Sequence, residues 1–261
     1  MQRTALIGHT GFVGSHVAAR HDFDDLYNTS NIDQIAGREY DLVVSAAGRA
    51  DSHRINEAAD EDRGELEAYA DILESARIGK LVHVSTVCVY DDTDRCDEGT
   101  VSPAENLTPY GLNRRDLETR LMKSFETLSL RLPQLFGNGI KKGLIYDLVN
   151  DHRVEFIRPD GVFQYYDLTR LWDDIGSALD AGLSTVNLAT PPVEHRQLAR
   201  IVFGVDLDQT FSGDPEPPFS AMYTRNMITR HADAFGASGD YLTSSVDVMN
   251  AIRSFAEGSS T

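Results

Sequence analysis

The first half of the chain alternates short apolar runs with longer amphipathic stretches. Each apolar run has the length of a buried strand, and the stretches between them have the spacing of helices with one buried side. Such alternation predicts a parallel sheet with helices on both faces. The predicted strands are residues 4–7, 25–28, 41–46, 80–85, 128–132 and 185–189, and the long predicted helices are residues 55–76 and 110–123.

The pattern changes after Leu132, where glycines and prolines divide the chain into short pieces typical of loops. A helix over residues 168–181 and the strand at 185–189 return to the sheet, residues 206–219 read as a surface loop, and a helix is predicted over 244–256. We therefore expect a main domain from residues 1–136 and 168–190. The remaining residues, 137–167 and 191–261, form a smaller lobe.

Composition narrows the class of protein. The 261 residues are 41% hydrophobic, enough for a core, and carry a net charge of −17, which disfavours nucleic acid as a partner. Cys88, in an apolar strand segment, and Cys96, in an acidic loop, suggest neither a disulfide framework nor a metal site. The chain opens directly on a predicted core strand, without a signal peptide or a membrane-length apolar run, so we expect a cytoplasmic protein.

A glycine-rich turn follows the first predicted strand: residues 8–14 read Gly-His-Thr-Gly-Phe-Val-Gly and lead into a helical pattern. Strand, glycine turn and helix together are typical of a dinucleotide-binding site. Three glycines allow the tight turn, the approach of a pyrophosphate and close packing of helix on strand. The predicted contacts to the dinucleotide come from Gly8, Thr10, Gly11, Phe12, Val13 and Gly14.

Three later segments complete a pattern. The strand ending at Ser85-Thr86 continues into Val-Cys-Val-Tyr at 87–90, Pro-Tyr-Gly-Leu-Asn-Arg occupies 109–114, and Arg-Leu-Pro-Gln-Leu-Phe-Gly occupies 131–137. With the glycine turn, these segments resemble the extended short-chain dehydrogenase/reductases, the NAD-dependent epimerases and dehydratases of nucleotide sugars. The likeness covers most of the first 190 residues. It implies an α/β fold with a Rossmann-type doubly wound parallel sheet and a small C-terminal lobe on the substrate side.

The resemblance implies a catalytic group of three residues: Thr86, Tyr110 and Arg114. Tyr110 exchanges a proton with a sugar hydroxyl or ketone, and Thr86 holds the reacting oxygen. Tyr110 and Arg114 are one helical turn apart, so both project from one face toward the sheet edge. A neighbouring cation and a positive nicotinamide lower the pKa of the tyrosine, which is otherwise near 10.

The remaining site predictions follow from the same likeness. We expect NAD or NADP to contact Asn28, Ala46, Ala47, Gly48, Ser85, Tyr110, Arg114, Leu132 and Pro133, and the substrate to contact Thr86, Tyr90 and Asn138. Lys141 and Lys142 are further candidates for a diphosphate. Asn28 stands where an acidic residue would favour NAD and a basic one NADP, so neither cofactor is selected. The family's homodimer contact would use the two long helices.

Three positions depart from the family pattern. Arg114 replaces the usual lysine, and arginine differs from lysine in reach and in its planar set of donors. Val87 and Cys88 replace the Asp-Glu pair of the dehydratases, which disfavours dehydration by that route. Phe163 stands where an arginine commonly contacts the diphosphate.

The sequence thus predicts an NAD(P)-dependent epimerase or 4-ketoreductase acting on a nucleotide-activated sugar. Two alternatives stay open. One is a cofactor-binding regulatory protein with weakened catalysis, which the Arg114 position would suit. The other is a reductase of a carbonyl that is not a sugar.

Overall fold

The computed structural model describes residues 3–213 and 224–259. Contacts within the chain define two compact units. The first unit contains Met1–Asp91, Glu98–Leu132 and Leu171–Asn187, and the second contains Asp92–Asp97, Pro133–Arg170 and Leu188–Thr261. Each unit is described separately below.

A six-stranded parallel sheet with strand order β2-β1-β3-β4-β5-β9 forms the centre of the first unit. The strands are β1 (Thr4–Ile7), β2 (Asp25–Tyr27), β3 (Glu39–Ser45), β4 (Arg77–Thr86), β5 (Thr127–Leu132) and β9 (Thr185–Asn187). All six were predicted as strands, and the α/β doubly wound fold is confirmed. β1 is buried along its whole length, as expected for a strand with helices on both sides.

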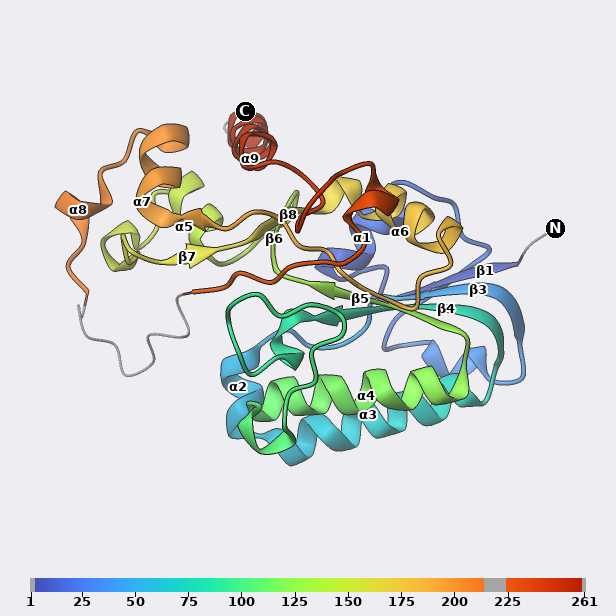
Figure 1. Cartoon of the computed structure of the whole chain (residues 1–261). Helices are drawn as coiled ribbons and strands as arrows, with labels where there is room; N and C mark the ends of the chain where they lie inside the picture. The colour runs from blue at the N-terminus through green and yellow to red at the C-terminus, as the bar shows by residue number, and fades with distance from the viewer. Residues whose placement is uncertain (1–2, 214–223, 260–261) are drawn as a thin grey trace. The chain divides into compact units, whose positions relative to one another are not determined.

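Two layers of helices cover this sheet (Figure 1). α1 (Phe12–Ala18) and α6 (Leu171–Asp180) lie on one face, and α3 (Ala59–Glu74) and α4 (Pro109–Ser124) lie side by side on the other. The predicted helix over residues 55–76 is wrong in one respect, since it consists of α2 (Ser52–Glu57) and α3. The backbone turns at Ala58, with φ −129° and ψ 50°, and the Asp51 side chain caps the start of α2.

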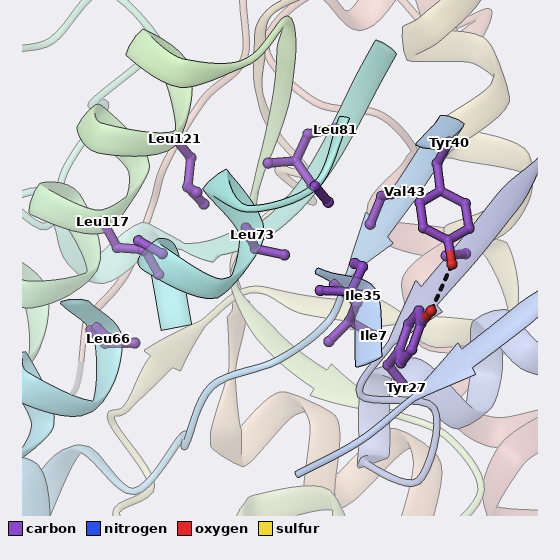
Figure 2. Close-up of a cluster of buried hydrophobic side chains, with 13 residues drawn as sticks. Ile7, Tyr27, Ile35, Tyr40, Val43, Leu66, Leu73, Leu81, Leu117 and Leu121 are labelled. Carbon is purple, nitrogen blue, oxygen red and sulfur yellow. Dashed lines mark hydrogen bonds between the residues drawn. The ribbon is translucent and has the colours of Figure 1, made fainter. Parts of the chain in front are cut away.

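A cluster of buried apolar side chains of the first unit packs between the sheet and the pair α3 and α4 (Figure 2). Leu66 and Leu73 of α3 and Leu117 and Leu121 of α4 meet apolar side chains of β1, β3 and β4. At the edge of this core the hydroxyls of Tyr27 and Tyr40 are 2.6 Å apart, so their polar ends stay paired where their rings are buried. This core fixes α4, the helix that carries the predicted catalytic residues, on the sheet.

The second unit has more regular structure than predicted from its glycines and prolines. Its strands are β6 (Gln134–Phe136), parallel to β8 (Tyr165–Asp167), and β7 (Val162–Phe163), antiparallel to β10 (Val193–Glu194). Its α-helices are α5 (Leu144–Val149), α7 (His195–Leu198), α8 (Leu207–Thr210) and α9 (Ser245–Ser259). The loop predicted over 206–219 begins with α8, and residues 214–219 lie outside the described part.

Short helical turns connect these elements. They are η1 (Ile32–Ile35), η2 (Val87–Val89), η3 (Ala104–Asn106), η4 (Val154–Phe156), η5 (Leu168–Arg170) and η8 (Ala232–Phe235), with a π-helical turn η6 (Ala199–Phe203). Cys88, predicted on a strand, lies in η2, because β4 ends at Thr86 and the Thr86 side chain accepts a hydrogen bond from the Cys88 backbone N–H.

Candidate functional site

The glycine turn directly follows β1, and its backbone meets the turn that follows β3. Gly8 has φ +85°, and a Cβ built there would lie 2.6 Å from the carbonyl oxygen of Ala46. Because β1 and β3 are parallel neighbours with Ile7 beside Ser45, both turns leave the sheet at its carboxyl edge. This edge is where open α/β sheets bind ligands.

Gly11 and Gly14 shape the start of α1. A Cβ at Gly14 would lie 2.1 Å from the carbonyl oxygen of Gly8, so any side chain there would displace the turn from the helix. Gly11 is the N-cap of α1; it provides no side-chain cap, and the first turn of the helix holds no acidic residue. No acidic side chain in the first turn therefore opposes the binding of an anion at the start of α1.

The other residues predicted to contact the cofactor lie close to strand ends. Ala46, Ala47 and Gly48 follow β3, and a Cβ at Gly48, which has φ +125°, would meet no atom within 4 Å. Asn28 follows β2, where its side-chain oxygen accepts hydrogen bonds from the backbone N–H and the hydroxyl of Ser30. Ser85 is buried in β4, Leu132 is the buried last residue of β5, and Pro133 follows it.

Tyr110 lies in the first turn of α4, close to the end of β4. The Thr108 side chain caps this helix by accepting from the Gly111 N–H, and the Asn56 side chain accepts from the Tyr110 N–H. A Cβ at Gly111 would lie 2.1 Å from the carbonyl oxygen of Cys88, so only glycine lets α4 approach η2 this closely. This contact brings Tyr110 to the segment that follows Thr86.

Tyr110 is only 8% exposed, and neighbouring groups act on the pKa of its phenol in opposite directions. Burial raises the pKa of Tyr110 above its ordinary value of 10, and the Cys88 thiol adds to this rise. Arg114 and a hydrogen bond with Thr86 act in the opposite direction. Thr86 and Arg114 thus lie next to Tyr110, and the pKa of the tyrosine is raised in the free protein.

Arg114 differs from the sequence-based expectation in the direction of its side chain. Its guanidinium donates to both carboxylate oxygens of Asp62 on α3, at 2.9 and 3.0 Å, and to the carbonyl oxygen of Arg49 at 2.7 Å. The guanidinium carbon lies 4.7 Å from the centroid of the Tyr110 ring. Arg114 thus binds α3 and covers the tyrosine ring, where we expected it to point to the sheet edge.

A second buried ion pair lies one turn farther along α4. Glu118 pairs with Arg131 of β5, which also donates to the Tyr90 hydroxyl at 2.6 Å, and Tyr90 donates to the side-chain oxygen of Asn187 at 2.9 Å. Burial alone would raise the pKa of Glu118, but Arg131 lowers it below its usual range. Tyr90, predicted to contact the substrate, is thus 3% exposed, with its hydroxyl inside this network.

Sequence reasoning missed Asp62, Asn56 and Glu118 as neighbours of the predicted catalytic residues. Asp62 is a charged residue at a position of α3 that faces the interior, between exposed Glu61 and Arg63. The sequence did contain a signal for Asp62, because it stands one helical turn before the apolar Leu66. This spacing puts its carboxylate on the same, packed face of the helix.

The residues of the second unit singled out in the sequence take different places. Asn138, Lys141 and Lys142 are exposed after β6. Phe163 stacks on His195, with ring centroids 5.3 Å apart, and a Cβ at Gly161 would lie 2.4 Å from that imidazole. Burial lowers the pKa of His195 to about 4, although the Arg158 carbonyl and Asp160 oppose this.

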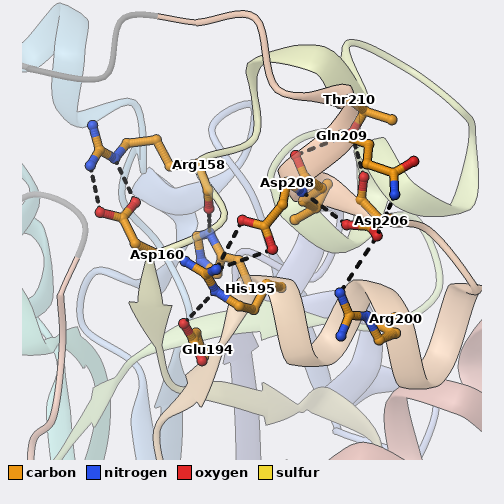
Figure 3. A network of polar contacts seen from close by, with 11 residues as sticks. Arg158, Asp160, Glu194, His195, Arg200, Asp206, Asp208, Gln209 and Thr210 are labelled. Atoms are coloured by element: carbon orange, nitrogen blue, oxygen red, sulfur yellow. Dashed lines mark hydrogen bonds and ion pairs between the residues drawn. The ribbon is translucent and has the colours of Figure 1, made fainter.

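Arginines around His195 are held in local pairs (Figure 3). Arg158 donates two hydrogen bonds to Asp160, and Arg196 pairs with both Glu194 and Asp208. His195 contacts the Arg158 carbonyl oxygen through Nδ1 at 2.9 Å. These contacts tie the antiparallel strands β7 and β10 to α7 and α8 and give this cluster a structural role.

None of the helices within residues 3–213 and 224–259 combines the length and the apolar character needed to cross a membrane.

Solved structures with the same fold include the following three proteins. MoeE5, solved with UDP-glucuronic acid and NAD, is 14% identical, with a TM-score of 0.76 and 98% of each chain covered. The UDP-glucose 4-epimerase of Thermotoga maritima, solved with UDP-glucose, is 13% identical, with a TM-score of 0.75 and 98% of each chain covered. A dTDP-4-dehydrorhamnose reductase of Clostridium acetobutylicum is 12% identical, with a TM-score of 0.74, and 99% of this chain and 100% of that chain are covered. At these identities the likeness establishes the fold.

Comparison with curated proteins gave no match. The family model described as "NAD dependent epimerase/dehydratase family" matches residues 20–154, more than half of the chain. This range contains Thr86, Tyr110 and Arg114 and begins after the glycine turn, so the turn is supported separately by its geometry. The chain belongs to the NAD-dependent epimerase/dehydratase family.

Proposed function

We propose that this protein binds NAD or NADP at the glycine turn and acts on a nucleotide-activated sugar as an epimerase or a 4-ketoreductase. Tyr110 is the proton-transfer group. The observation that carries the proposal is the meeting of Tyr110 with Thr86 and Arg114 at the carboxyl end of β4, in the sheet whose β1 leads into Gly8, Gly11 and Gly14. These residues come from segments far apart in the chain.

The residues at the sheet edge fit a dinucleotide. Gly11 adds no side chain in front of the first turn of α1, and the space beside Gly48 is open, so backbone amides are accessible to a pyrophosphate. Thr10, Phe12 and Val13 line the same turn, and Asn28, Ala46, Ala47, Ser85, Leu132 and Pro133 lie at the strand ends. A bound nicotinamide would supply the hydride donor or acceptor.

Tyr110 then moves the proton that accompanies hydride transfer. The phenol has an ordinary pKa near 10, which burial raises further, so it is protonated at neutral pH and can donate the proton of its hydroxyl to a substrate ketone. The Thr86 hydroxyl holds the same oxygen in place. In the reverse direction Tyr110 accepts the proton, and the positive charge of Arg114 favours the phenolate that does so.

The residues after Thr86 restrict the reaction. Val87 is buried and apolar, and Cys88 donates its backbone N–H to Thr86, so the carboxylate pair used for water elimination has no counterpart at these two positions. This favours epimerisation or ketone reduction over dehydration. On the substrate side, exposed Asn138, Lys141 and Lys142 are candidates to contact the nucleotide diphosphate.

A second candidate function is supported by the Asp62–Arg114 ion pair. Because the guanidinium is bound to α3, it is less available to a cofactor than a lysine would be. A protein that binds the dinucleotide and turns over slowly, with a regulatory role, is consistent with this arrangement.

We further propose that residues 1–136 and 168–190 bind the dinucleotide, that residues 137–167 and 191–261 bind the substrate, and that the protein acts in the cytoplasm. A homodimer would use α3 and α4.

The test is turnover of UDP- and dTDP-linked hexoses and their 4-keto forms, followed by nicotinamide absorbance and by product analysis for epimers. We expect activity with at least one of these substrates and its loss in Tyr110→Phe, with cofactor affinity within a few-fold of wild type. Normal turnover by Tyr110→Phe would refute its role. Cofactor binding without turnover of any of these sugars would support the regulatory alternative.

A further inference from the structure

The cation next to the proposed proton-transfer group has its own anchor on a different helix. Asp62 of α3 and Arg114 of α4 are both buried, with side chains 6% and 7% exposed, and the guanidinium binds both carboxylate oxygens. A third hydrogen bond runs from Arg114 to the Arg49 carbonyl. A planar guanidinium held at three points has little freedom to turn to another partner.

The anchor is itself held in place. The Asn113 side chain donates to Asp62 at 2.9 Å and also to the Ala59 carbonyl oxygen at 2.9 Å, and Asn113 is only 3% exposed. The carboxylate therefore receives hydrogen bonds from two consecutive residues of α4. Such a buried pair is costly in desolvation, and it has no need of a cofactor to complete it.

The charge that Tyr110 experiences depends on this pair. Arg114 covers the ring of Tyr110, and Cys88 and Thr86 also act on the pKa of its phenol. The charges of Arg114 and Glu118 act in turn on the pKa of His83 on β4. Since Asp62 neutralises Arg114 directly, the positive charge offered to the phenol is smaller than that of a lone cation.

Resting on the function proposed above, we propose that Asp62 is a positioning residue: it fixes the Arg114 guanidinium against the Tyr110 ring, so that this cation acts on the tyrosine and does not bind the dinucleotide. Arg114 is therefore not among the residues that we propose to contact the cofactor, although its position in the sequence suggests such a contact. Asp62 sets how much positive charge Tyr110 receives.

The test compares Asp62→Asn with Asp71→Asn, which removes an exposed carboxylate from the same helix. Tyrosines labelled in the ring are titrated by NMR, and the Tyr110 signal is identified by its loss in Tyr110→Phe. Asparagine keeps the size of the Asp62 side chain and one oxygen that can accept from Arg114, so the guanidinium stays over the Tyr110 ring while its charge is no longer neutralised. We therefore expect the midpoint of Tyr110 to fall by about one pH unit in Asp62→Asn and to stay unchanged in Asp71→Asn.

The same substitution in an Arg114→Met background separates positioning from a direct effect of the Asp62 charge. We expect Asp62→Asn to shift the Tyr110 midpoint there by less than a third of its effect in the wild-type background. An equal shift in both backgrounds would overturn the proposal, as would an unchanged midpoint in folded Asp62→Asn. The double variant Asp62→Asn/Arg114→Met removes both charges of the buried pair, so no unpaired charge is left in the interior.

A measurement on the wild-type protein covers the case in which Asp62→Asn does not fold. A guanidinium fixed at two carboxylate oxygens rotates slowly about its C–N bonds, which NMR of labelled arginine detects. We expect slow rotation of Arg114 and cross-peaks to the Tyr110 ring, both unchanged by saturating NADH. Fast rotation in the free protein, or a rearrangement of Arg114 when NADH binds, would overturn the proposal. If NADH does not bind at all, the proposed function fails, while the free-protein measurement still tests the anchor.

Discussion

The backbone of Gly8 and the α-carbon of Gly14 are so close that a Cβ on Gly14 would lie 2.1 Å from the Gly8 carbonyl oxygen. That oxygen also accepts a hydrogen bond from the Gly11 N–H at 2.9 Å, so it cannot move without opening the turn. A methyl group at Gly14 would therefore displace the Gly8 carbonyl and disturb the whole glycine turn.

Gly14→Ala is expected to reduce NADH affinity at least tenfold and to lower the free energy of unfolding by about 1–3 kcal/mol, the usual cost of overpacking. Calorimetric titration and urea unfolding measure both effects. The matched control is Gly64→Ala in α3, where a Cβ would meet nothing within 4 Å. This substitution should leave NADH affinity unchanged and stabilise the helix by about 0.5–1 kcal/mol. Equal behaviour of the two variants would contradict the account of the turn.

Glu118→Gln should destabilise the protein strongly, because it leaves the Arg131 guanidinium buried without its carboxylate. Breaking such a pair costs about 3–5 kcal/mol. Glu39→Gln is the control, since Glu39 and Arg77 are 4.0 Å apart and both largely exposed, and a surface pair contributes at most about 1 kcal/mol. Urea unfolding of both variants at neutral pH provides the comparison. A loss below about 1 kcal/mol in Glu118→Gln would show that the buried network does not stabilise α4.

His83 should make the protein sensitive to acid. It is 1% exposed, and within the described residues neither ring nitrogen has a hydrogen-bond partner. Burial lowers the pKa of His83 from 6.5 to about 4; the Arg114 charge adds to this and Glu118 opposes it. Between these two values the unfolded chain binds a proton that the folded chain does not, so stability falls as the pH drops from about 6.5 toward 4.

The expected loss from His83 alone is about 2 kcal/mol between neutral pH and pH 5. His83→Leu should remove this part of the pH dependence and cost little at neutral pH, because it replaces two unpaired polar atoms. His195 has a similarly lowered pKa and should account for part of the remaining slope. The matched control is His53→Gln, at a histidine whose side chain is 88% exposed. An unaltered acid slope in His83→Leu would refute this explanation.

The sheet could be predicted because its strands are contiguous apolar runs in an alternating pattern, and β1 coincides with residues 4–7. The glycine turn could be predicted because its backbone requirements are local. The break at Ala58 could not, since the helical pattern of polar and apolar residues continues through it.

The partners of the catalytic residues required the three-dimensional structure. Asp62 and Arg114 are 52 positions apart, and an arginine in a helix can serve solvent, cofactor or an ion pair with the same local sequence. The partner of Tyr90 could not be predicted either, because Asn187 is 97 positions away on the edge strand β9. Buried polar networks depend on tertiary packing, and a single sequence carries no periodic signal for them.

The most direct test of the account is titration of the purified protein, stripped of any copurified nucleotide, with NADH and NADPH by nicotinamide fluorescence. The account predicts saturable binding of at least one of them, one molecule per chain, and its loss in Gly14→Ala. Failure of both to bind to folded wild-type protein would contradict the cofactor site and the function built on it.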